Sequence, residues 1–401
     1  MSPRPLADPD VGERIRARRL LRGWSIRYAA SRAGISHATW GRIERGLQAA
    51  NNRFMLADIA EALECSSGDL AGAPVPGTDR AATATRAGVH ALRTALIDID
   101  LTEPGVAGSP AMAELDRVLS LVDTLRQACD YAGTMRLLPG LLHHLHAETA
   151  GPERGRALRL LCEATFIASS VLRNLGHPGD AWLGAERCRD AAEAVDDPVL
   201  LAYAAYALAT AATASGSHQR GQTIAERAAG DLRRHLSRPG GAEILGSLQL
   251  ISAKAARGRG HPEDSAAWLA EAKRLARRTG ETTTMGLYFG PTNVDIWRIS
   301  IEVNEGDAER AAAVARRTSP MAIAAGFRQV FYYADTARAL AHLTGREREA
   351  VRYLLTAERI APQHVHTTAD LHATTRTLLA RLHRQAGGAE LRGLSERMWT
   401  P

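Results

Sequence analysis

Apolar residues recur along most of the chain with the spacing of amphipathic helices, and no segment keeps the two-residue alternation of a half-buried strand. From about residue 83 to residue 396, Ala- and Leu-rich segments follow one another and are interrupted by Gly, Pro and Asp. In the segment 266–277, for example, the apolar residues fall on one side of a helix. The pattern therefore predicts an all-α protein.

A change in composition divides the chain. Residues 1–71 have the pattern of short helices, whereas the segment 72–78 (GAPVPGT) is rich in Pro and Gly and cannot continue a helix. We predict an N-terminal domain over residues 1–71, a linker over 72–82 and a helical domain over 83–401.

Five helices are predicted in the N-terminal domain, over residues 11–21, 26–33, 37–45, 53–63 and about 66–70. The expected caps are Asp10 or its neighbours, Ser25, Ser36, and Asn51 or Asn52, and the expected stops are Gly23, Gly34 and Gly46. The second and third helices are joined by residues 33–36, where Gly34 permits a tight turn and Ala30 is small at the helix crossing. This arrangement predicts a helix-turn-helix.

The distribution of charged residues also suggests DNA as a binding partner. The chain has 401 residues, of which 45% are hydrophobic and 23% charged, so it has room for two or three domains and is neither disordered nor collagen-like. Residues 11–45 hold nine arginines and two glutamates, a net charge of +7, against +6 for the whole chain. Such a compact basic segment indicates a polyanionic partner, DNA first, although a solvated helix face is the alternative.

The N-terminal residues resemble the lambda-repressor-like (XRE) DNA-binding domain. The resemblance covers about 65 residues and rests on an ordered set of signals: GERIR at 12–16, Arg19, RGWS at 22–25, AA at 29–30, AGIS at 33–36, RIERG at 42–46, the segment 56–63 and DL at 69–70. It implies that Arg19 and Glu44 form a structural ion pair and that the third helix enters the major groove.

The DNA-contacting residues implied by this resemblance are Arg27, Ser36, His37, Ala38, Thr39, Gly41 and Arg42. Arg42 can bind a guanine edge with two hydrogen bonds, and His37 can donate to a base or a phosphate. Ser36 and Thr39 can bond phosphates, and Arg27 is expected to contact the DNA backbone. Because Ala38 and Gly41 offer few hydrogen bonds, recognition can rely on DNA shape or on a thymine methyl.

The sequence also departs from the family pattern at three positions. Ile26 stands where Gln is common, and Arg18 stands where an apolar residue is usual. Trp40 is bulky for its position, and we interpret it as a core residue. A version of the fold that binds a protein rather than DNA is therefore kept as an alternative.

The C-terminal region repeats its turns. Glycines 176, 216, 260, 306 and 345 are separated by 40, 44, 46 and 39 residues, and each is expected to end one helix before the next begins. The pattern resembles tetratricopeptide (TPR) repeats, whose period is about 34 residues, and predicts a TPR-like α-solenoid with longer helices or loops. An irregular helical bundle is the alternative. A solenoid offers a concave surface suited to a peptide or protein segment.

A ligand groove is expected where aromatic residues concentrate, between residues 288 and 333. Asn293 and Trp297 lie four residues apart on one helix face, Arg298 flanks them, and an Asn amide can both donate to and accept from a peptide backbone. The candidate ligand-binding residues are Tyr288, Asn293, Trp297, Arg298 and Tyr332. Core packing is the alternative explanation of the cluster.

No enzyme is predicted, and no metal or cofactor. The phosphate-binding, dinucleotide-binding and nucleophile-elbow motifs are missing, and the His-rich segments 142–148 and 364–372 lack the zinc-protease spacing. Four separated cysteines suit a reducing compartment, no secretory signal is visible, and the uncharged run 198–219 is interpreted as a buried helix rather than a membrane span. We expect a cytoplasmic, nucleoid-associated protein with no membrane partner.

The order of the two domains resembles peptide-responsive regulators of Gram-positive bacteria and an actinobacterial group of XRE–TPR regulators. The resemblance implies a homodimeric transcriptional regulator that binds a double-stranded DNA operator. Its TPR-like domain would sense a peptide, a small molecule or a protein partner. The alternative is a TPR adaptor whose N-terminal domain docks a protein.

Overall fold

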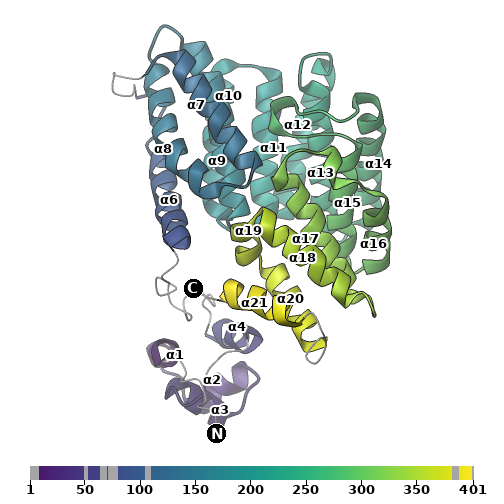
Figure 1. Ribbon diagram of the computed structural model, residues 1–401. Helices are drawn as coiled ribbons and strands as arrows, with labels where there is room; N and C mark the ends of the chain where they lie inside the picture. Colours follow the sequence, from purple (N-terminus) through teal and green to yellow (C-terminus); the bar gives the residue numbers. More distant parts are fainter. Residues whose placement is uncertain are drawn as a thin grey trace. The chain divides into compact units, whose positions relative to one another are not determined.

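The computed structural model describes residues 9–48, 53–63, 70, 80–103, 110–381 and 388–399. These residues divide into two compact units, one before residue 80 and one from Arg80 onward. Every regular element in these ranges is a helix, so the predicted all-α class is confirmed for the described residues (Figure 1).

The N-terminal unit contains α1 (Pro9–Leu21), α2 (Ile26–Arg32), α3 (His37–Glu44) and α4 (Arg53–Ala62). The predicted serine caps are present: Ser25 Oγ accepts from the Tyr28 amide at 3.2 Å, and Ser36 Oγ accepts from the Thr39 amide at 3.0 Å. Gly23, Gly34 and Gly46 follow the first three helices with φ of 66°, 65° and 67°.

One expected helix cap is not observed in this unit, and other expected features lie where the structure does not describe the chain. Asp10 lies within α1, which begins at Pro9, rather than capping it. Asn51 and Asn52, and all of the expected fifth helix except Leu70, lie outside the described residues.

A separate hydrophobic core holds the N-terminal unit together. Its largest fully buried side chains are Ile15, Trp40, Ile59, Leu63 and Leu70. Gly12 allows α1 to approach the end of α3, because a Cβ at this position would lie 2.3 Å from the Ile43 carbonyl oxygen.

The second unit starts with α6 (Arg80–Ile97), α7 (Met112–Gln127) and α8 (Tyr131–Glu148). The first helix begins three residues before the expected boundary at residue 83. Five helical pairs follow: α9 (Arg154–Asn174) with α10 (Pro178–Val195), α11 (Pro198–Ala214) with α12 (His218–Leu232), α13 (Gly241–Gly258) with α14 (Pro262–Thr279), α15 (Pro291–Asn304) with α16 (Ala308–Arg317), and α17 (Gly326–His342) with α18 (Glu347–Ile360). Three helices come last: α19 (Pro362–Thr367), α20 (Ala369–Arg381) and α21 (Gly388–Trp399).

The five predicted turn glycines each connect the two helices of one pair. Gly176, Gly216, Gly260, Gly306 and Gly345 have φ of 83°, 84°, 77°, 81° and 80°. This left-handed conformation is accessible to glycine at little cost, which explains why a glycine ends the first helix of every pair. The repeated helical pairs confirm the predicted solenoid-like array.

The first helices of the pairs stack on one another in chain order, from α9 through α11, α13 and α15 to α17 (Figure 1). α11 is buried along most of its length, which explains its uncharged sequence. In the described part of the chain, none of the helices combines the length and the apolar character needed to span a bilayer.

The last helices of the array contact its first helices. α17 contacts α7, where the Arg126 guanidinium lies 4.5 Å from the centre of the Phe327 ring. The His364 Nδ1 of α19 lies 3.0 Å from the carbonyl oxygen of Asn174, the last residue of α9. The stacked first helices therefore surround an interior instead of forming an open concave face.

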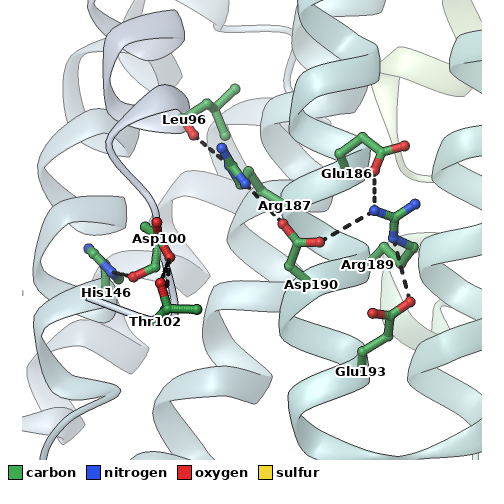
Figure 2. A network of polar contacts seen from close by, with 9 residues as sticks. All are labelled: Leu96, Asp100, Thr102, His146, Glu186, Arg187, Arg189, Asp190 and Glu193. Atoms are coloured by element: carbon green, nitrogen blue, oxygen red, sulfur yellow. Dashed lines mark hydrogen bonds and ion pairs between the residues drawn. The ribbon is translucent and has the colours of Figure 1, made fainter. Parts of the chain in front are cut away.

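Polar contacts attach α6 to the helical pairs. Arg187 of α10 donates through Nε to the Leu96 carbonyl at 2.9 Å and through Nη1 to Asp190 at 3.0 Å (Figure 2). Arg93 of α6 binds Asp180 with two hydrogen bonds of 2.7 and 2.6 Å. These bonds hold the first helix of the second unit on α10.

Candidate nucleic-acid interface

α3 is amphipathic, and its two faces separate core residues from candidate contact residues. Trp40, Ile43 and Glu44 are buried. The opposite face exposes Ser36, His37, Ala38 and Arg42, while Thr39 and Gly41 are half-buried. The predicted DNA-contacting residues of α3 therefore lie on its solvent side.

Glu44 fixes the orientation of α3. Its carboxylate accepts from Arg19 Nε at 2.6 Å, from Arg19 Nη2 at 2.9 Å and from Trp40 Nε1 at 2.5 Å. Arg19 Nη1 also donates to the Trp24 carbonyl at 2.7 Å. Arg19 belongs to α1, Trp40 and Glu44 belong to α3, and the Trp24 carbonyl belongs to the loop after α1. Their hydrogen bonds therefore hold these three segments together. Trp40 is fully buried.

A groove on the unit's surface brings α1, α2 and α3 together. We call it the recognition groove; its lining includes Arg16, Arg27, His37, Ala38, Gly41 and Arg45. Arg27, His37, Ala38 and Gly41 were singled out from the sequence. Arg16 and Arg45 were not, although both belong to the basic segment that was.

The hydroxyls of Ser36 and Thr39 are partly engaged within the protein. Their oxygens lie 2.8 Å apart, so one hydroxyl donates to the other, and Ser36 Oγ also accepts from the Thr39 amide. Only one hydroxyl hydrogen of the two remains for a phosphate oxygen. The cationic groups must therefore supply most of the phosphate contacts that this surface can make.

The arginines of this unit are distributed so that their charge faces solvent. Arg16, Arg27, Arg32, Arg42 and Arg45 are exposed, whereas Arg19 is buried and neutralised by Glu44. Arg45 Nε donates to the Gly41 carbonyl at 2.9 Å, which directs this side chain back along α3. The exposed cations give the recognition groove and its rim a positive potential.

The candidate ligand residues of the second unit do not gather in one site. Tyr288 is buried with its ring 5.7 Å from that of Phe327, and Tyr332 donates to the Ala315 carbonyl at 3.0 Å. Asn293 is 1% exposed, and Arg298 donates to Glu302 at 3.1 Å.

Trp297 lines a hollow inside the array. We call it the interior hollow; its lining includes Arg173, Tyr206, Lys254, Trp297, Arg328 and Phe331. It lies among the first helices of the five pairs and adjoins a second space that shares Arg173, Tyr206 and Arg328 with it. Sequence reasoning missed its cations. One available signal was Lys254, a charge within an otherwise apolar stretch of α13.

The His-rich segments contact separate parts of the array instead of converging on one site. His146 Nε2 lies 2.7 Å from the Asp100 carbonyl oxygen, and His366 Nε2 lies 3.0 Å from Glu358 Oε1. Within the described ranges, no group of three or more His, Cys, Asp or Glu side chains is arranged to hold a metal ion. Cys162 and Cys188 are buried free thiols whose sulfur atoms lie 3.5 Å apart.

Comparison with known proteins identifies the type of domain that the N-terminal unit forms. Residues 10–72 match the family model described as "Helix-turn-helix domain", and this unit is a helix-turn-helix domain. No curated protein matches the chain in sequence. Among solved structures, the chain is similar to Bacillus thuringiensis PlcR in a crystal structure with the peptide PapR7 and DNA. The two are 14% identical, the match covers 77% of this chain and 93% of the PlcR chain, and the TM-score is 0.33.

Proposed function

We propose that this protein is a sequence-specific, DNA-binding transcriptional regulator that works as a homodimer. The observation that carries the proposal is the solvent face of α3, where Arg42 and His37 are exposed while Trp40 and Glu44 anchor the helix from behind. The family match over residues 10–72 supports the same assignment. α3 enters the major groove, Arg42 reads a base edge, and Arg27 neutralises a phosphate.

The helical array acts as the sensing and dimerising part of this regulator. Its interior hollow is lined by charged and aromatic side chains that can contact a ligand, and its first helix is bound to α10 by hydrogen bonds. An effector is bound in the array, and a change in the array alters the spacing of two DNA-binding domains in the dimer. Candidate effectors are a peptide, a small molecule or a protein.

The test starts from selection of bound fragments out of sheared genomic DNA of the source organism with the purified full chain. Affinity for a selected fragment is then measured by fluorescence anisotropy between 50 and 200 mM salt. A regulator is expected to lose affinity steeply with salt and to prefer the selected fragment over random DNA.

Two substitutions separate base reading from backbone binding. Arg42→Ala is expected to cost about 1–3 kcal/mol on the selected fragment and to relax preference at one base pair, because a bidentate base contact is lost. Arg27→Ala is expected to weaken all sequences alike and to flatten the salt dependence. Arg136→Ala, on the exposed side of α8 in the other unit, is the matched control.

Absence of salt-dependent DNA binding would contradict the proposal and favour an adaptor whose N-terminal unit docks a protein. If Arg42→Ala binds the selected fragment like the unaltered chain, α3 is not the reading helix.

A further inference from the structure

Three cationic side chains and one carboxylate, that of Asp335, line the interior hollow. Arg173 comes from α9, Lys254 from α13 and Arg328 from α17. Arg328 is 8% exposed, and its buried Nε has no hydrogen-bond acceptor. Among the described residues, none of the three charged groups takes part in an ion pair or a hydrogen bond.

The other charged residues near the interior hollow are already paired. Asp335, which also lines it, accepts from Arg338 Nη1 at 2.7 Å. Arg126 lines the adjoining space and donates through Nε to Asp123 at 2.8 Å. The acidic groups of this region are thus satisfied elsewhere, and the surplus of positive charge belongs to the three unpaired cations.

This arrangement costs folding free energy. Burial lowers the pKa of Lys254 and of Arg173. Asp335 opposes this shift for Lys254 and Tyr206 opposes it for Arg173, while the cationic neighbours lower both pKa values. Burying like charges that form no ion pair lowers the stability of the fold for two reasons: each charge loses its hydration, and the charges repel one another. Removing one of them should therefore not weaken the fold, whereas supplying an anion should strengthen it.

Aromatic side chains complete the lining. Lys254 Nζ lies 5.8 Å from the centre of the Trp297 ring, and Tyr206 and Phe331 line the same hollow. The hollow is partly open to solvent and adjoins the second space, with which it shares Arg173, Tyr206 and Arg328. Cations beside aromatic faces suit a compact molecule that has both an anionic end and a flat apolar body.

We propose that the interior hollow binds a small organic oxyanion, a carboxylate or a phosphate ester, whose oxygens are held by Arg173, Lys254 and Arg328. The guanidinium groups match the two oxygens of such an anion, and the ammonium adds a third donor. The aromatic rings hold the body of the molecule. This inference gives the effector of the proposed regulator a chemical class, and its regulatory meaning rests on that proposed function.

The test uses purified full chain without DNA. Benzoate and phenyl phosphate serve as probes at constant ionic strength, with benzyl alcohol as the uncharged analogue and chloride as the reference anion. Thermal melting and calorimetric titration measure binding. Probes that bind the folded state are expected to raise the melting temperature, and the two anions distinguish a carboxylate site from a phosphate site.

Lys254→Met keeps the length and apolar volume of the side chain and removes its charge. It is expected to weaken probe binding at least tenfold and to melt, without probe, no lower than the unaltered chain. Lys273→Met removes an exposed charge from α14 and is the matched control; it should bind the probes normally. Arg173→Met is a second variant with the same expected loss.

The inference is overturned if neither anion stabilises the unaltered chain beyond chloride, if benzyl alcohol does so equally, or if Lys254→Met and Arg173→Met respond like Lys273→Met. A chain that binds the probes but no DNA would refute the proposed regulator and leave this site standing. A chain that binds DNA but neither probe would refute this site and leave the proposed regulator standing.

Discussion

Glu44 shows how one buried carboxylate can organise a recognition surface. Its oxygens accept from Arg19 and from the indole of Trp40, so the helix that faces solvent is held by bonds on its hidden side. The Trp40 ring fills the core at the same time. An exposed α3 can therefore keep one orientation without contacts on the surface that would meet DNA.

We predict that Glu44→Ala destabilises a 1–79 fragment by about 3–5 kcal/mol, because Arg19 is left as a buried charge without its partner. The measurement is thermal or urea unfolding of the fragment followed by circular dichroism. Glu13→Ala, which removes an exposed carboxylate from α1, is the control and should change the transition little. Equal stability of the two variants would show that the buried pair contributes nothing to the fold.

Glu163 of α9 links stability to pH. Burial raises the pKa of its carboxyl to about 7, and Asp123 and Asp116 contribute to the rise. The folded state then holds a proton that the unfolded state has lost between about pH 4.5 and pH 7. Stability from this group is fully present below that window and decreases as the pH rises through it.

We predict that Glu163→Gln raises the melting temperature at pH 8.5, where the carboxylate would be charged, and has much less effect at pH 4.5. The amide resembles the protonated acid, so the difference between variant and unaltered chain isolates this group from all others. Melting curves at both pH values, with Glu193→Gln on the exposed side of α10 as the control, provide the check. A pH-independent difference would place the pKa of Glu163 near its ordinary value.

At the scale of the element, glycines set how closely the helices of the array approach one another. Gly246 of α13 faces the ring of Phe289, which is fully buried; a Cβ at this position would lie 2.0 Å from the ring's Cζ. Gly184 of α10 likewise lies against the backbone of Ser169 in α9, with a Cβ-to-amide-nitrogen distance of 3.0 Å. These glycines serve close packing rather than turns, since none has a positive φ.

We predict that Gly246→Ala destabilises the full chain by about 1–3 kcal/mol, because the added methyl would collide with the buried Phe289 ring. Gly230→Ala in α12 is the matched control: no atom lies within 4 Å of its Cβ, so alanine should stabilise this helix by up to about 1 kcal/mol. Urea unfolding of both variants measures the difference. A Gly246→Ala chain as stable as the control would show that Phe289 repacks freely.

At the scale of the whole molecule, the described units have separate cores joined through a short segment. Residues 72–78, seven in number, contain two prolines and two glycines, and α6 begins at Arg80. α6 is held on α10 by Arg93 and Arg187. α6, which follows the connecting segment in the chain, is therefore bound to the array through α10.

We predict that the full chain is a dimer in solution and that the 1–79 fragment is monomeric. Two linked domains convert the second binding event into an intramolecular one, so the fragment should bind a selected operator roughly 10²–10⁴ times more weakly. Sedimentation or light scattering gives the oligomeric state, and anisotropy gives the affinities. A monomeric full chain with tight operator binding would contradict the prediction.

The helices, the serine caps of α2 and α3, the glycine turns and the helix-turn-helix could be predicted from the amino-acid sequence. These features follow from local rules, because hydrophobic spacing, capping side chains and the conformational freedom of glycine act over a few residues. Residues 33–36 and the five repeated turn glycines are the clearest cases.

The position and the lining of the interior hollow, in contrast, depend on how distant helices pack together. Arg173, Lys254 and Arg328 come from three different helical pairs, and they meet because the array returns on itself through α17 and α19. Trp297 and Tyr332 belong to one aromatic-rich stretch of sequence, yet the first lines the hollow and the second packs against Ala315. The direction in which a side chain points depends on the rotation of its helix against distant neighbours, and a helical period alone leaves that rotation open.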